Sequence, residues 1–150
     1  MKSTACLVGV VFPIALLTGC NSDVPVTASL QIPNEGTLTV TRTATHPFLA
    51  RFSLMLTMQG QGTCRAETEL FPDTGYVSRR NLYRVEERLY YLIGQYDARV
   101  INFEDCRVIL SEFHSLKTQI TFLGSFDLDE GKQWSYLAAD QRAERPFERR

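Results

Sequence analysis

The sequence predicts an all-β domain, a single antiparallel barrel or sandwich of about seven or eight short strands. Two observations lead to this prediction. Apolar and polar residues alternate with a period of two in several short segments, and turns rich in Gly, Pro and Asp separate these segments. The segments are also rich in Thr, Val, Tyr and Phe, the residue types that pack well on a pleated surface.

The first half of the domain contains the clearest strands. Thr37–Thr43 alternates, with threonines on one face and Leu38 and Val40 on the other. Residues 48–58 and 63–70 alternate on either side of the glycine-rich turn 59–62, which predicts a β-hairpin. The apolar face of 48–58 is the longest in the chain and comprises Phe48, Ala50, Phe52, Leu54, Leu56 and Met58.

The segment 76–97 has two interpretations. Leu82, Val85, Leu89, Leu92 and Ile93 have helical spacing, which allows one helix within 78–93. The same segment reads as strand if its tyrosines lie on a pleated surface. We favour strand because the flanking segments are β.

The rest of the domain is expected to add strands at 99–103, 106–110, 116–127 and 133–137, after a turn at 71–75. Residues 139–150 contain few apolar side chains and mixed charges, so we expect an exposed, mobile tail.

The first 20 residues carry a targeting signal. Lys2 precedes an apolar run from Ala5 to Leu17, which is expected to be helical and is too short to span a bilayer core of about 30 Å. The run ends in Leu17-Thr18-Gly19-Cys20, which resembles the lipobox of bacterial lipoproteins. The resemblance implies cleavage before Cys20 and a diacylglycerol group on its thiol, because the thiolate is the strong nucleophile nearby.

This resemblance also implies an organisation and a location. Residues 1–19 would be a signal peptide, and a lipidated tether would begin at Cys20. The small and polar residues that follow, with prolines at 25 and 33, indicate that the tether covers 20–35 with an edge strand near 26–32, and 36–138 is the expected β domain. The protein would be held in the bacterial cell envelope by lipid. Asn21, rather than Asp, follows the cysteine, which favours the outer over the inner membrane.

Composition limits the partners. The chain has 16 Lys+Arg and 17 Asp+Glu, a formal net charge of −1, so a general nucleic-acid binder is excluded. After Leu17 no second long apolar run follows, so lipid on Cys20 is the expected membrane attachment.

Cys64 and Cys106 remain once Cys6 leaves with the signal and Cys20 carries lipid. In an oxidising compartment the two are expected to form a disulfide, although two separate buried thiols remain an alternative. The pairing predicts Cα atoms about 4.4–6.8 Å apart. Both cysteines begin runs with apolar neighbours on the same strand face, namely Ala66 and Leu70, and Val108 and Leu110.

The motifs give no support for an enzyme, a metal site or a cofactor. His114 lies near serines and Glu112 but without a nucleophile elbow, so it is expected to be a loop histidine rather than a base. Glu67 and Glu69 share a strand face with Arg65, which is typical of a solvated hairpin face rather than a glycosidase pair.

Binding is the favoured class of function. Aromatic and arginine side chains interleave in the segment 76–97, and both types are enriched at interface hot spots. The alternative is that the rings are core and the arginines plain surface. The candidate binding residues are Arg79, Arg80, Tyr83, Arg84, Arg88, Tyr90, Tyr91 and Trp134.

Three functions follow from these expectations. The first is a non-catalytic envelope module that binds a protein or a glycan and faces the periplasm. The second is an inhibitor or immunity protein that neutralises an envelope hydrolase or toxin. The third, an enzyme, is the least favoured.

Overall fold

The computed structural model describes residues 24–74, 77–111 and 119–147, and in these ranges the chain is all β without a helix. None of the described residues belongs to a helix long and apolar enough to cross a membrane. The expected signal segment 5–17, Cys20 and His114 lie outside the described ranges.

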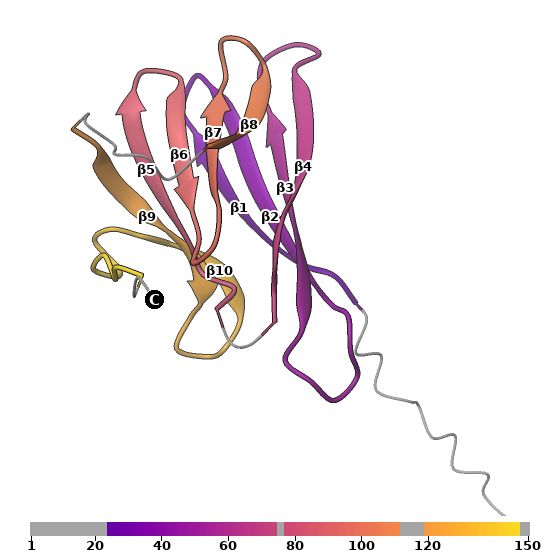
Figure 1. Cartoon of the computed structure of the whole chain (residues 1–150). Coiled ribbons are helices and arrows are strands. Elements are labelled where there is room, and N and C mark those ends of the chain that lie inside the picture. Colours follow the sequence, from indigo (N-terminus) through magenta and orange to yellow (C-terminus); the bar gives the residue numbers. More distant parts are fainter. Residues whose placement is uncertain (1–23, 75–76, 112–118, 148–150) are drawn as a thin grey trace, which may run out of the picture.

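Two antiparallel sheets pack face to face as a sandwich (Figure 1). The four-stranded sheet follows chain order, β1-β2-β3-β4, and the six-stranded sheet has the order β10-β9-β5-β6-β7-β8, so β9 returns to pair with β5. The strands are β1 (Val26–Ile32), β2 (Gly36–Ala44), β3 (Phe52–Gln59), β4 (Arg65–Asp73), β5 (Arg80–Glu86), β6 (Leu89–Ile93), β7 (Ala98–Asn102), β8 (Arg107–Ser111), β9 (Thr121–Leu128) and β10 (Trp134–Ala138).

The period-two pattern places the core between the sheets. In the four-stranded sheet Leu30, Leu38 and Met58 align across three strands and face inward. One residue further along, Gln31, Thr37 and Gln59 align on the outer face. The largest fully buried side chains come from both sheets: Leu38, Leu54, Leu56, Met58, Leu70, Leu82, Tyr90, Leu92, Ile101 and Phe126.

The described residues contain ten strands, more than the seven or eight predicted. The edge strand expected near 26–32 is present as β1, at the edge of the four-stranded sheet. The segment 76–97 forms two strands instead of one, which adds to the count. No helix forms within 78–93: a turn at Glu87–Arg88 separates β5 from β6. Leu82 pairs with Leu92, so the helical spacing of these residues was coincidental.

Several predicted strand boundaries are wrong. β4 continues to Asp73, through part of the turn predicted at 71–75. β3 begins at Phe52, and residues 45–51 form a loop in which Phe48 is exposed. Cys106 lies in the turn before β8 with φ 54°, and Leu110 is 57% exposed instead of facing the core.

The segment 139–147 is exposed over most of its length, but it contacts the six-stranded sheet instead of extending freely. Arg142 and Arg145 both form ion pairs with Asp127 on β9. Glu144 accepts a hydrogen bond of 2.7 Å from the Tyr83 hydroxyl. This segment therefore covers part of the outer face of β5 and β9.

Candidate binding site

Half of the predicted binding residues are part of the folded interior. Arg80, Tyr83, Tyr90 and Trp134 are each at most 7% exposed, so they cannot form a binding surface. Arg79, Arg88 and Tyr91 are half-buried, and of the eight candidates Arg84 alone is exposed. The structure therefore does not bring these eight residues together as one surface.

Arg80 joins three segments of the chain. Its guanidinium donates hydrogen bonds to the carbonyls of Val77, Ser78 and Arg79, and to that of Phe71 on β4. The group lies 3.5 Å from the Asp97 carboxylate, and both side chains are at most 3% exposed. Burial lowers the pKa of Arg80 from its ordinary value, while the charge of Asp97 opposes that effect.

Asp97 completes this cluster from the turn between β6 and β7. Its carboxylate accepts a hydrogen bond of 3.0 Å from the N–H of Phe71 and lies 3.6 Å from the Arg99 guanidinium. Arg99 in turn donates to the carbonyl of Glu69. Because Phe71 and Glu69 belong to β4 and Arg99 to β7, the buried charges link one sheet to the other.

Tyr83 and Trp134 also have structural roles. The Tyr83 hydroxyl donates to Glu144 and accepts a hydrogen bond from Asn81. Burial, assisted by the bond to the Glu144 carboxylate, raises the pKa of Tyr83 to about 12. The Trp134 indole N–H donates to the carbonyl of Val40 across the core at 2.8 Å.

Tyr90 lies at the other end of the core. It is fully buried, and its hydroxyl donates to Glu35 Oε2 at 2.7 Å. Burial, followed by the hydrogen bond to Glu35, raises the pKa of Tyr90. The guanidinium of the exposed residue Arg84 donates a hydrogen bond of 3.4 Å to the same hydroxyl. Tyr90 thus connects Arg84 to Glu35 through two hydrogen bonds.

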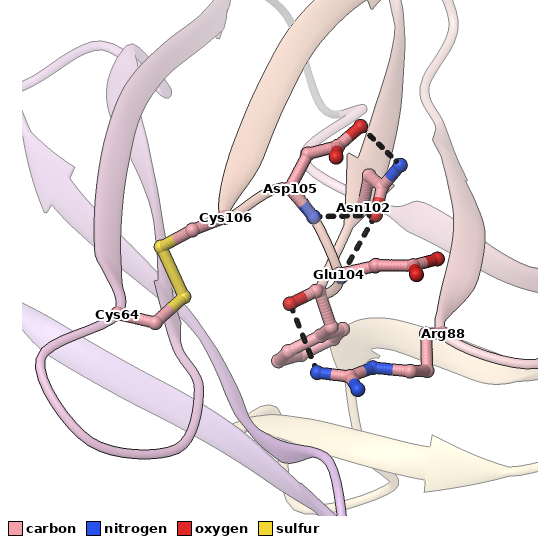
Figure 2. The surroundings of a disulfide bond; sticks show 7 residues. Cys64, Arg88, Asn102, Glu104, Asp105 and Cys106 are labelled. Atoms are coloured by element: carbon pink, nitrogen blue, oxygen red, sulfur yellow. Dashed lines mark hydrogen bonds between the residues drawn. A yellow bond between two sulfur atoms is a disulfide. The ribbon is translucent and has the colours of Figure 1, made fainter.

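The disulfide between Cys64 and Cys106 joins the β3–β4 turn to the β7–β8 turn (Figure 2). The two Cα atoms are 5.6 Å apart, within the range predicted from the sequence. The turn that carries Cys106 is held by Asn102, whose side-chain oxygen accepts the N–H groups of Glu104 and Asp105. Arg88 donates to the Phe103 carbonyl beside this turn.

An open pocket of about 380 Å³ is lined by residues of the β1–β2 and β3–β4 turns, and one lining residue, Gly60, lies beside Cys64 of the disulfide. Amide side chains and backbone dominate its lining, which comprises Gln31, Asn34, Glu35, Gly36, Thr37, Gln59, Gly60 and Gln61. Its volume is in the range of small-molecule sites.

Hydrogen bonds fix the shape of this pocket. Thr37 donates to Gln31 Oε1 at 2.6 Å, and Gln31 donates to the Gly36 carbonyl. Gln61 bridges the two turns by donating to the Asn34 carbonyl at 2.7 Å. The amide groups of Gln31 and Gln61 are therefore preorganised, and each retains further capacity to donate and accept hydrogen bonds.

Sequence reasoning identified the turn at 59–62 but neither the β1–β2 turn nor the pocket between the two turns. A signal was present, since Asn34-Glu35-Gly36 and Gln59-Gly60-Gln61 each follow a strand. Once β2 pairs with β3, the turns that begin β2 and end β3 must lie at the same end of the sheet.

Other candidate sites have ordinary roles or fall outside the described residues. Glu67 and Glu69 are exposed on β4, and a hydrogen bond from Arg65 lowers the pKa of Glu67. Within the ranges that the structure describes, no group of three or more His, Cys, Asp or Glu side chains could hold a metal ion.

Compared with models of protein families, with curated proteins and with solved structures, the chain matches none of them.

Proposed function

We propose that this protein is a lipid-anchored, non-catalytic binding module of the bacterial cell envelope. Cys20, at the end of Leu17-Thr18-Gly19-Cys20, would carry the lipid, and the β-sandwich would face the periplasm. The ligand we favour is a neutral polar molecule of the glycan class, bound in the amide-lined pocket.

One observation carries the proposal: the pocket and the start of the folded chain lie at opposite ends of the sandwich. β1 begins at Val26 beside the end of β2, and it ends at the turn that lines the pocket. Figure 1 has the start of β1 at the lower end and the β1–β2 and β3–β4 turns at the upper end. A strand of seven residues spans roughly 23 Å. A chain anchored before Val26 would therefore present the pocket away from the membrane.

The chemistry of the lining favours a glycan. Gln31, Gln59 and Gln61 provide uncharged donors and acceptors, which match the hydroxyl and acetamido groups of sugars. Glu35 is the one ionisable side chain of the lining. It is 9% exposed and accepts a hydrogen bond from the Tyr90 hydroxyl, so little of its charge faces the pocket.

Calorimetric titration of the full chain in detergent micelles with soluble fragments of envelope glycans tests this proposal. Gln59→Ala should lower the affinity about tenfold, by removal of one donor–acceptor group. Gln133→Ala is the matched control, because Gln133 is an exposed glutamine in the β9–β10 turn at the other end. Equal affinities of the two variants, or no binding by the parent chain, would contradict the proposed pocket.

Cross-linking in intact cells, followed by purification of the chain, separates the remaining classes of partner. Recovery of envelope-assembly proteins would favour a protein-binding module. Recovery of one hydrolase or toxin as the dominant partner would favour the inhibitor or immunity function.

We also propose that the protein resides in the outer membrane, because Asn21 follows the lipidated cysteine. Density-gradient separation of the two membranes should place most of the protein in the outer-membrane fractions. Its recovery mainly in inner-membrane fractions would refute this location.

A further inference from the structure

The loop between β2 and β3 presents apolar side chains to solvent. Phe48 is 90% exposed and Leu49 is 48% exposed, although each is large enough to belong to a core. The sequence pattern assigned Phe48 to the apolar face of a strand, and the structure places it at the tip of the loop. Exposure of one side chain is common, but two adjacent ones at a loop tip are a candidate contact.

This loop has a defined conformation. His46 Nδ1 accepts the N–H groups of both Phe48 and Leu49, at 3.1 and 3.0 Å. The N–H of Arg51 donates to the Leu49 carbonyl, and the N–H of Thr45 donates to the Arg51 carbonyl. These bonds satisfy the backbone of the loop locally and leave the Phe48 side chain pointing away from the sandwich.

The exposed loop lies at the end where the folded chain begins. Val26 pairs with Arg42, two residues before β2 ends at Ala44 and the loop starts. In Figure 1 the β2–β3 loop and the start of β1 share the lower end of the molecule. Val24 and Val26, 59% and 43% exposed, add to the apolar side chains at this end.

The chain length between the lipid site and this end limits their separation. Six residue steps connect Cys20 to Val26. Fully extended, six steps span at most about 22 Å, less than the thickness of a bilayer core. A lipidated Cys20 would therefore keep the loop within reach of the membrane surface.

We propose that the β2–β3 loop inserts Phe48 and Leu49 into the interface of the bilayer that holds the lipid on Cys20. This inference rests on the proposed function, since it needs the anchor. Apolar side chains that enter the boundary between headgroups and acyl chains add to the affinity of a lipid anchor. Arg51 is exposed next to them, and its long side chain can reach lipid phosphates. The contact gives the sandwich a fixed orientation, with the amide-lined pocket facing away from the membrane.

Tryptophan quenching by brominated lipid tests the proposal directly. The full-length chain is purified from membranes and reconstituted in phosphatidylcholine vesicles whose acyl chains carry bromine near the headgroup. The variant Phe48→Trp places a reporter at the loop tip. The matched control Glu104→Trp places one at an exposed position in the β7–β8 turn, at the pocket end. The parent chain supplies the background signal of Trp134, which is 7% exposed.

Brominated vesicles should quench the added fluorescence of Phe48→Trp by roughly half or more and leave that of Glu104→Trp unchanged. Equal quenching of both reporters, or of neither while the chain co-sediments with vesicles, would overturn the inference and leave the anchor intact. Failure of the parent chain to associate with vesicles would overturn both the inference and the lipid anchor.

Discussion

Arg80, Asp97 and Arg99 form a small cluster of buried, oppositely charged side chains. Asp97 is 2% exposed and lies between Arg80 and Arg99, which come from β5 and β7. Gly94 makes room for this arrangement, because a Cβ atom there would lie 2.6 Å from Arg80 Nε. A tight fit of this kind explains why an arginine that looked like a surface residue in the sequence lies in the interior.

Removal of Arg80 should therefore destabilise the fold strongly. Arg80→Ala removes one of the two guanidinium groups beside the Asp97 carboxylate, and loss of one partner of a buried ion pair costs about 3–5 kcal/mol. Arg107→Ala, at an exposed position of β8, should change the free energy of unfolding by no more than about 0.5 kcal/mol. Urea unfolding of both variants measures the difference, and equal stabilities would show that the cluster contributes little.

Two glycines allow backbone strain alone to be compared with backbone strain combined with steric crowding. Gly36 has φ 150°, and a Cβ atom there would lie 2.1 Å from the Gln59 carbonyl oxygen. Gly62 has φ 63° with no atom within 4 Å of the same position. Gly62→Ala should therefore cost only the strain of the left-handed backbone, about 1–2 kcal/mol.

Gly36→Ala should lower the free energy of unfolding by more than Gly62→Ala, because the strand pairing of β2 with β3 must shift. It should also abolish ligand binding in the pocket that Gly36 lines. Thermal or urea unfolding checks the order of the two variants, and a larger effect at Gly62 would contradict the crowding argument.

Alkaline pH should weaken the docking of the C-terminal segment through Tyr83. The folded-state pKa is about 12, above the ordinary value of 10, so the fold favours the neutral phenol. Its contribution to stability is complete below about pH 10 and is lost as the pH rises through about 12.

The variant Tyr83→Phe checks the sign of this effect. Its free energy of unfolding should fall less steeply between about pH 10 and pH 12 than that of the parent chain. Parallel pH profiles of the two proteins would show that Tyr83 does not titrate in this window.

At the scale of elements, the disulfide fastens the two sheets at the pocket end. Cys64 and Cys106 are 42 residues apart in sequence and belong to turns of different sheets. Phe103, buried beside this bond, lies against Gly36 and Gly60, which line the pocket. The pocket wall is thus supported by the covalent link and by an aromatic side chain.

Replacement of both Cys64 and Cys106 by Ala should lower the free energy of unfolding by about 2–5 kcal/mol, the usual range for small secreted domains. Urea unfolding of the double variant and the parent chain measures this loss. Thiol titration of the denatured, unreduced parent chain is the control, and two free thiols per chain would exclude the bond.

The elements that could be predicted from sequence are those whose alternation is unbroken. Leu38 and Val40, and Leu54, Leu56 and Met58, were assigned to core faces and are all fully buried. The alternating pattern predicted the wrong strand ends where a local hydrogen bond holds the backbone in a loop or turn. His46 accepts the N–H of Phe48 in the β2–β3 loop, and Asn102 accepts the N–H of Glu104 in the turn that contains Cys106.

The segment 76–97 shows the limit of periodicity. The turn at Glu87–Arg88 interrupts the alternation of apolar and polar residues between β5 and β6. The apolar residues on its two sides therefore fit the spacing of a helix and that of a hairpin equally well.

The pocket could not be predicted from either turn alone, because its lining comes from two hairpins that the strand register brings together. The burial of Arg80 likewise depends on Asp97, a partner 17 positions away.

At the scale of the whole molecule, the two ends of the sandwich differ in chemistry. The end where β1 begins carries the exposed apolar loop, and the end where β1 finishes carries the disulfide and the amide-lined pocket. This polarity suits a protein that is held at one end and binds at the other. The lipid on Cys20 is the part of the proposal on which that orientation depends.

Mass spectrometry of the N-terminal peptide measures the lipidation of Cys20 directly, on protein purified from the membrane fraction. We predict that the mature chain begins at Cys20, with a diacylglycerol group on its sulfur and an acyl group on its amine. An intact Met1 terminus, or a Cys20 without lipid, would contradict the anchor and with it the proposed orientation of the sandwich.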